Sequence, residues 1–309
     1  MHCALCNTPL GTIVSEKDAK TGAPLEVRIC NACGLVQQAC LPTESELRVY
    51  YSHHYREDYK KTYSPKLKYV LRAGQAAKER IRFLGNGLAG LGLTQNASLL
   101  DIGAGGGEFV FAARKAGFDA CGIEPNEGYS EYARKEYNID VRTEHLDQVS
   151  GVNYDVVTLY HVLEHIADPA KALHHIWALT KPGGFLVVEV PNIEQNDASP
   201  ANIFFKAHLF YFSAATLRAI ASPFFEQVKC ENSGNLKILF RRKDQISKLV
   251  LPSITDVELT KKRLKDKTWL EYLIQGGGWL KPFRRIFQLQ KESRLKNQAP
   301  LAVLNSALS

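Results

Sequence analysis

An α/β fold, in which strands alternate with helices, is predicted by three neighbouring features in the middle of this 309-residue chain. The apolar pair Leu99-Leu100 indicates the end of a buried strand. A turn with three spaced glycines follows and opens into the run 108–113, which is typical of a helix. A second apolar run, 120–123, comes next and ends at Glu124. The order of strand, glycine-rich turn, helix and strand is the opening unit of a sheet with helices on its faces.

The glycine-rich turn also predicts a ligand. Glycine lets a ligand approach the backbone because no side chain stands in the way. Glu124 follows Gly103 by about 20 residues, where an acid can accept both hydroxyls of an adenosine ribose. The spacing fits NAD as well, but Asp101 lies just before the first glycine, where a carboxylate repels a pyrophosphate and attracts an ammonium group. We therefore expect an adenosine ligand that carries a positive charge.

Two motifs follow farther along the chain. A strand is predicted at 155–160, with His161 directly after it, and a Lys-Pro-Gly-Gly turn at 181–184 precedes the next strand. With the glycine-rich turn and Glu124, these motifs resemble the class I S-adenosylmethionine-dependent methyltransferases over roughly residues 95–240. The resemblance implies a doubly wound, Rossmann-like sheet of seven mostly parallel strands, with the cofactor at the carboxyl ends of the strands. The residues that it implies for binding S-adenosylmethionine are Asp101, Gly103, Ala104, Gly105, Gly107, Glu124, Pro125, Tyr160 and His161.

Two Cys-x-x-Cys pairs near the start of the chain predict a zinc site. The pairs are Cys3 with Cys6 and Cys30 with Cys33. Each pair forms a turn whose thiolates point at one centre, and four thiolates satisfy tetrahedral zinc. Because four cysteines close the coordination shell, we expect this zinc to be structural.

The zinc knob and the tyrosine-rich segment after it are similar to those of sugar methyltransferases that act on nucleotide-linked deoxysugars. That resemblance implies a sugar-containing small molecule or glycan as substrate. Those families often carry a further carboxy-terminal domain, for which this chain is too short, so we expect O-methylation rather than C-methylation. The crowded tyrosines are expected to pack the knob onto the main domain or to cap the cofactor or substrate; they are Tyr50, Tyr51, Tyr55, Tyr59, Tyr63 and Tyr69.

A sugar hydroxyl needs a general base, because its pKa lies far above neutrality. His208 follows the fifth predicted strand, where a substrate lid belongs. The resembling enzymes have a Glu-His pair there, with the histidine as base, whereas this chain has Ala207 in the place of the glutamate. We therefore predict His208 as the base, with His161 and His165 as alternatives at the end of the fourth strand.

The charge of the chain is concentrated at its carboxy-terminal end. Residues 241–309 hold 15 Lys and Arg against 6 Asp and Glu, although the whole chain has a net charge of only +7. A helix is predicted after the glycines 276–278, with Leu280, Phe283 and Phe287 on one face. We expect it to pack on this protein or a partner subunit, or to lie peripherally on an anionic membrane. The last ten residues are expected to fray.

No apolar stretch reaches 18 residues, so no membrane-spanning helix is predicted. The start of the chain resembles no signal peptide, and the paired cysteines favour a reducing cytoplasm. The sequence predicts four parts: a zinc-ribbon knob at 1–43, a tyrosine-rich helical linker or cap at 44–94, a catalytic domain at 95–243 and a basic helical extension at 244–309.

Several alternatives stay open at this point. They are an RNA base methyltransferase, a small-molecule O-methyltransferase of quinone or polyketide type, and a cofactor-binding scaffold without activity. Nucleic acid is the less expected substrate because residues 1–240 are not basic. The run 161–165 is formally the H-x-x-E-H of a zinc peptidase, but its position at the end of a strand in the recognised fold argues against one. The oligomeric state stays open.

Overall fold

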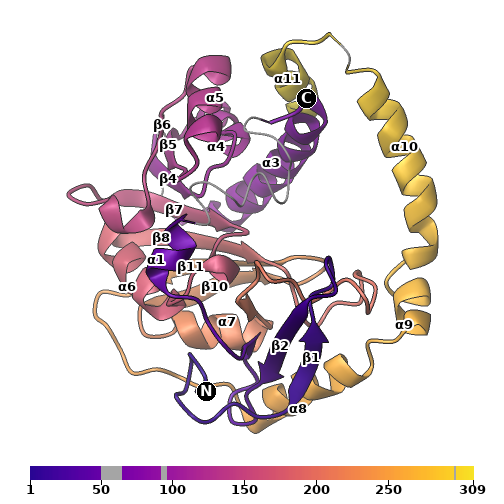
Figure 1. Cartoon of the computed structure of the whole chain (residues 1–309). Helices are drawn as coiled ribbons and strands as arrows, with labels where there is room; N and C mark the ends of the chain where they lie inside the picture. The colour runs from indigo at the N-terminus through magenta and orange to yellow at the C-terminus, as the bar shows by residue number, and fades with distance from the viewer. Residues whose placement is uncertain (50–64, 92–95, 296) are drawn as a thin grey trace.

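Seven strands form the central sheet of the computed structural model, which describes residues 1–49, 65–91, 96–295 and 297–309 (Figure 1). Their order is β10-β11-β8-β7-β4-β5-β6. The strands from β8 to β6 are parallel, and β11 is antiparallel to both β8 and β10. The predicted mostly parallel, seven-stranded sheet is confirmed. The strand bounds are β4 (Ser98–Ile102), β5 (Asp119–Ile123), β6 (Val141–Arg142), β7 (Tyr154–Tyr160), β8 (Thr180–Val190), β10 (Phe225–Glu231) and β11 (Leu236–Arg242).

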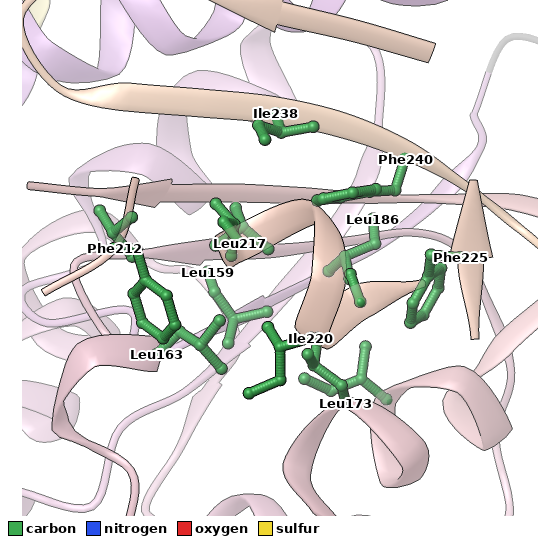
Figure 2. Packing of buried hydrophobic residues seen from close by; sticks show 14 of the residues in the cluster. Leu159, Leu163, Leu173, Leu186, Phe212, Leu217, Ile220, Phe225, Ile238 and Phe240 are labelled. Atoms are coloured by element: carbon green, nitrogen blue, oxygen red, sulfur yellow. The ribbon is translucent and has the colours of Figure 1, made fainter. Parts of the chain in front are cut away.

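Helices cover both faces of this sheet. Along β7, Val157 and Leu159 belong to one apolar cluster, and Val156 and Tyr160 belong to another on the opposite face. Figure 2 shows the first cluster, in which Ile220 from a helix lies among the strand residues. A strand that is buried on both faces has an almost continuous run of apolar residues, which is why these strands are easy to recognise in the sequence. The first face carries α6 (Pro169–Leu179) and α7 (Ala214–Ala221), and the second carries α3 (Leu67–Leu88), α4 (Glu108–Lys115) and α5 (Glu127–Tyr137).

The amino-terminal region forms a second, four-stranded sheet in the order β1-β2-β3-β9. Its first three strands are β1 (Ile13–Lys17), β2 (Pro24–Ile29) and β3 (Val36–Gln38). The fourth, β9 (Phe210–Tyr211), comes from the segment that follows β8 of the central sheet. The knob therefore shares a sheet with the segment 95–243, which the sequence did not predict. The short helix α1 (Glu44–Val49) follows the knob.

Four helices follow the central sheet: α8 (Ile254–Lys265), α9 (Trp269–Ile274), α10 (Lys281–Ser293) and α11 (Pro300–Leu308). Figure 1 shows α9 and α10 along the outer edge of the molecule, with α11 returning to α3. The expectation that the last residues fray is wrong. Val303 and Leu304 in α11 are fully buried, and the side chain of Ala307 lies against Gly74 of α3, where a Cβ would come within 2.7 Å of it. Among the described residues, no helix combines the length and the apolar character that crossing a bilayer requires.

Candidate active site

A cavity of about 590 Å³ opens at the carboxyl ends of β4, β5 and β7. Parallel sheets place ligands at this edge because the loops that follow the strands leave a crevice there. The cavity is lined by eight of the nine residues that the sequence assigned to the cofactor, namely Asp101, Gly103, Ala104, Gly105, Glu124, Pro125, Tyr160 and His161.

Gly107, the ninth predicted residue, has a structural place instead. It precedes α4 with a φ of 83° and is absent from the cavity wall. A Cβ at Gly107 would stand 2.6 Å from the Cδ1 of Ile139 and 2.8 Å from the Cβ of Ala133. The third glycine is therefore required for close packing of the turn, a role that its spacing did not distinguish from ligand contact.

Glu124 is held at the end of β5 by the backbone of the glycine-rich turn. Its carboxylate accepts hydrogen bonds from the N–H of Gly105 at 2.9 Å and from the N–H of Asn126 at 3.2 Å. The residue is only 4% exposed and lines the cavity. These bonds orient a carboxylate beside the turn, which is the arrangement that recognises a ribose.

Asp101 lies at the end of β4, deep in the cavity. The hydroxyl of Thr158 donates to its Oδ1 at 2.7 Å. Burial raises the pKa of Asp101 to about 7, although the Thr158 hydrogen bond and the charge of Arg80 act in the opposite direction. A carboxyl group this close to its titration point becomes fully ionised when a cation binds beside it.

His161 is held between two carboxylates. Its Nε2 lies 3.0 Å from Glu189 and its Nδ1 lies 3.4 Å from Glu164. Burial alone would lower the pKa of His161, but the two carboxylates raise it to about 9. The imidazole is therefore protonated at neutral pH and cannot accept a proton there. The left-handed backbone of His161, with a φ of 58°, shows that these contacts hold the residue in a strained conformation.

Arg80 completes this ionic group from α3. It makes two hydrogen bonds to Glu189, at 3.0 and 3.1 Å, and its guanidinium lies 4.2 Å from the centre of the Tyr160 ring. Burial alone would raise the pKa of Glu189, but His161 and Arg80 together lower it well below its ordinary value. The group forms a rigid, charged part of the cavity wall.

His208, the predicted base, is absent from the residues that line the cavity, whereas His165 is among them. The two rings meet edge to face with their centres 5.0 Å apart. Burial, together with the neighbouring His165, lowers the pKa of His208 to about 4. His208 therefore contacts His165 but is not itself among the described residues of the cavity wall.

His165 has a fixed orientation. Its Nδ1 lies 2.7 Å from the carbonyl oxygen of Ala207, so Nδ1 carries the proton and donates it. Its Nε2 is 3.8 Å from Glu164, whose side chain is 1% exposed. Burial alone would raise the pKa of Glu164, but the imidazoles of His165 and His161 lower it to about 2. The backbone of Ala207 thus orients an imidazole, although its methyl side chain cannot.

Glu164 and His165 lie in a single 3₁₀ turn, η3 (Leu163–His165). A zinc peptidase needs the two histidines of H-x-x-E-H on one α-helix. The structure supports the sequence argument against a peptidase.

Sequence reasoning missed the wall that α3 supplies. One face of this helix lines the cavity through Tyr69, Arg72, Ala73, Ala76 and Arg80. The spacing of three, four and seven residues is the signal that could have found this face. Of the tyrosines expected to pack the knob or cap the site, only Tyr69 is described, and it lines the cavity. The others lie outside the described residues: Tyr50, Tyr51, Tyr55, Tyr59 and Tyr63.

The four predicted zinc ligands come together at the amino terminus. The Sγ atoms of Cys3 and Cys33 are 3.5 Å apart, as are those of Cys6 and Cys30. All four lie within 4.8 Å of one another. Thiolates bound to one zinc at about 2.3 Å stand slightly farther apart than 3.5 Å, so the set fits a tetrahedral ion with little movement.

The knob also contacts the segment that carries His208. The Gln38 side chain donates to the carbonyl oxygens of Lys206 and His208, both at 2.9 Å. Asp18 accepts from the N–H of Lys206 at 2.6 Å. The knob therefore fixes the backbone on which His165 depends for its orientation.

Comparison with known sequences shows which family this chain matches. The profile of a family described as a methyltransferase domain matches residues 56–223. The chain is 34% identical over 107 residues to a ubiquinone biosynthesis O-methyltransferase of Hydrogenovibrio crunogenus, covering 32% of this chain and 44% of the relative. It is 34% identical over 110 residues to the protein of the same name from Bordetella avium, covering 33% of this chain and 45% of that one. The chain thus spans less than half the length of these curated relatives.

Among solved structures, the chain is similar in fold to magnesium protoporphyrin IX methyltransferase from Synechocystis PCC 6803 with bound S-adenosylhomocysteine. The TM-score is 0.50 at 16% identity, and the match covers 65% of this chain and all of the other.

Proposed function

Because this chain belongs to the methyltransferase-domain family, we propose that it transfers a methyl group from S-adenosylmethionine to a hydroxyl oxygen of an aromatic small molecule. The observation that carries the proposal is the cavity at the ends of β4, β5 and β7, where Glu124 is bonded to the glycine-rich turn and Asp101 lies deep inside. The names of the curated relatives also support an O-methyltransferase.

The residues fit the cofactor. Glu124 would accept the ribose hydroxyls, since its carboxylate is oriented by the turn that a nucleoside approaches. Asp101 would face the ammonium group and ionise fully on binding, because its pKa of about 7 leaves it partly protonated in the free protein. When bound, the sulfonium supplies an electrophilic methyl group, and the attacking oxygen has to give up a proton.

His165 is the residue best placed to accept that proton. It lines the cavity, and the carbonyl of Ala207 fixes the ring through Nδ1, so that Nε2, on the side of Glu164, is the atom that would take up the proton. His161 is unsuitable because Glu164 and Glu189 keep it protonated. We assign His208 a supporting position beside His165, in place of the catalytic role that its sequence context indicated.

An aromatic acceptor is supported by the aromatic side chains of the cavity wall. Beyond the glycine-rich turn, the described residues that line the cavity include Tyr69, Phe109 and Tyr129. Charged side chains such as Arg72 and Glu144 line it too, and these can bond the hydroxyls of a sugar. The resemblance to sugar methyltransferases keeps a sugar as the second candidate.

We also assign a structural zinc to Cys3, Cys6, Cys30 and Cys33. The ion would hold the two turns together and thereby the sheet in which β3 pairs with β9. With four thiolates the shell is closed, so this zinc takes no part in methyl transfer. Elemental analysis after dialysis is expected to give about one zinc per chain, and replacement of Cys33 by serine is expected to lower it.

The test of function is a methyl-transfer assay with labelled donor. Catechols and other phenols, nucleotide sugars and tRNA are supplied in parallel, and the labelled product is identified by mass spectrometry. We expect label on a phenolic oxygen. Label on a sugar or on RNA would overturn the aromatic substrate, and absence of donor binding by calorimetry would overturn the activity.

Two variants separate the histidines. His165→Ala is expected to lower the single-turnover rate about 100-fold or more with donor affinity retained, because a general base acts in the transition state. His208→Ala is expected to lower it less, since His208 does not line the cavity. The reverse order would restore His208 as the base.

A further inference from the structure

The exposed tryptophan and phenylalanine side chains are concentrated in one segment. All three tryptophans and all 14 phenylalanines lie among the described residues. The four of these that are exposed all occur between residues 269 and 287. They are Trp269, Trp279, Phe283 and Phe287, which are 56–65% exposed. We call residues 269–293, which contain α9 and α10, the outer strap; it runs along the edge of the molecule (Figure 1).

The outer strap contacts the rest of the protein through polar groups. Glu292 of α10 pairs with Arg72 of α3 at 2.6 Å. Glu271 of α9 accepts from the side chain of Asn196 at 3.1 Å, and the ammonium group of Lys281 donates to the carbonyl of Asp197. These contacts fix which side of the strap faces inward.

The opposite side of α10 is apolar. Phe283, Ile286 and Phe287 share one face of the helix because they are three and four residues apart. They are 54–65% exposed, whereas Gln288 and Glu292 on the other side are half-buried. This order is the reverse of that in a helix packed on its own core, so the apolar face is directed at something outside the chain.

The charge around this face identifies the chemistry of that partner. Lys281, Arg284, Arg285 and Lys291 lie on α10, whose single acid, Glu292, is already paired with Arg72. Residues 241–309 as a whole carry 15 basic against 6 acidic side chains. An apolar face with aromatic residues, flanked by Lys and Arg, matches an anionic lipid surface. A second copy of the chain is a poor partner, because face-to-face docking would bring two basic straps together.

We propose that the outer strap binds the surface of an anionic lipid bilayer, with Phe283, Ile286 and Phe287 in the boundary between headgroups and acyl chains. Arg284 and Lys291, which flank this apolar face, contact the headgroups. Arg72 both lines the cavity and holds Glu292 on the inward side of α10, so the strap is anchored at the cavity wall. The proposal does not depend on which hydroxyl is methylated.

Co-sedimentation of the full chain with vesicles tests this inference. We compare phosphatidylcholine alone with mixtures that contain phosphatidylglycerol, at low and high salt. We expect binding to the anionic vesicles, weakened by salt because the basic side chains are screened. Tryptophan emission is expected to shift to the blue on binding, since Trp269 and Trp279 lie in the strap.

The decisive variant combines Phe283→Glu with Phe287→Glu. It is expected to reduce vesicle binding at least about tenfold, because it places two charges in the apolar face. The matched control combines Val250→Glu with Ile254→Glu, which are 64% and 85% exposed outside the strap and change the net charge equally. We expect this control to bind within about twofold of the unchanged chain.

Three results would overturn the proposal. They are lack of binding to anionic vesicles at low salt, equal loss of binding in the two double variants, and a dimer in light scattering that the Phe283 and Phe287 changes abolish. Circular dichroism and donor calorimetry on each variant show whether it remains folded, independently of the acceptor.

Discussion

Helices α3 and α10 are both amphipathic, but they direct their apolar faces in opposite senses. In α3, Val70 and Leu84 are fully buried, and its polar face supplies Arg80 to the cavity wall. In α10, Phe283 and Phe287 are exposed, and the polar side faces inward. An amphipathic pattern therefore establishes that a face will be covered, but the rest of the molecule decides what covers it.

The largest expected loss of stability comes from a substitution in α3, the more buried of the two helices. Arg80→Met removes the cationic partner that makes two bonds to Glu189 and leaves this buried carboxylate with His161 and the amide of Asn235 beside it. We expect a loss of about 3–5 kcal/mol in the free energy of unfolding, as for other buried pairs broken on one side. Urea denaturation measures it. A loss below about 1 kcal/mol would show that water reaches this pair.

Substitutions in the apolar faces of α3 and α10 are expected to differ in their cost to stability. Leu84→Ala in α3 is expected to cost about 2–5 kcal/mol of stability, because it leaves a cavity in a packed layer. Phe287→Ala in α10 is expected to change stability by less than about 0.5 kcal/mol, because that side chain is 65% exposed. Thermal unfolding of both variants without lipid compares them. Equal losses would mean that α10 packs on the protein in solution.

Two histidines beside the cavity are expected to make the stability of the folded protein depend on pH. The folded pKa of His208, about 4, lies below its ordinary value of 6.5, so the unfolded chain binds this proton first as the pH falls. The unchanged protein is expected to lose about 1–3 kcal/mol of stability between pH 6.5 and 4 from this group, and His208→Gln to lose that much less.

The contribution of His161 to stability changes with pH in the opposite direction. Its folded pKa of about 9 gives a contribution that is present at neutral pH and declines as the pH rises toward 9. Urea denaturation of the unchanged chain and of His208→Gln at several pH values tests the assignment. Parallel curves below pH 6.5 would contradict it for His208.

Of the two ion pairs compared, the smaller effect is expected at Arg72. Its ion pair with Glu292 has the same chemistry as that of Arg80 with Glu189, but the Arg72 side chain is 49% exposed. Arg72→Met is expected to cost at most about 1 kcal/mol, because solvent screens the pair. Measured beside Arg80→Met by the same denaturation, it isolates the effect of burial. A cost equal to that of Arg80→Met would contradict this interpretation.

Much of the site could be predicted because its signals are local. The turn of Gly103 and Gly105, the acid Glu124 and the Cys-x-x-Cys pairs each depend on backbone geometry within a few residues. The family match confirms the methyltransferase domain that these motifs predicted. The wall formed by α3 was missed because a helix face shows its spacing but not what it faces.

The sequence by itself determined the central sheet, the cofactor turn and the convergence of the four cysteines, since short-range sterics and periodicity specify them. Only the tertiary structure decided that His165 rather than His208 lines the cavity, that β9 joins the knob to the catalytic domain, and that α10 directs its apolar face outward. Each of these depends on contacts between segments far apart in the chain, such as Gln38 with His208 and Arg72 with Glu292. Local propensity carries no information about such pairings, because their energy arises only when the folded elements meet.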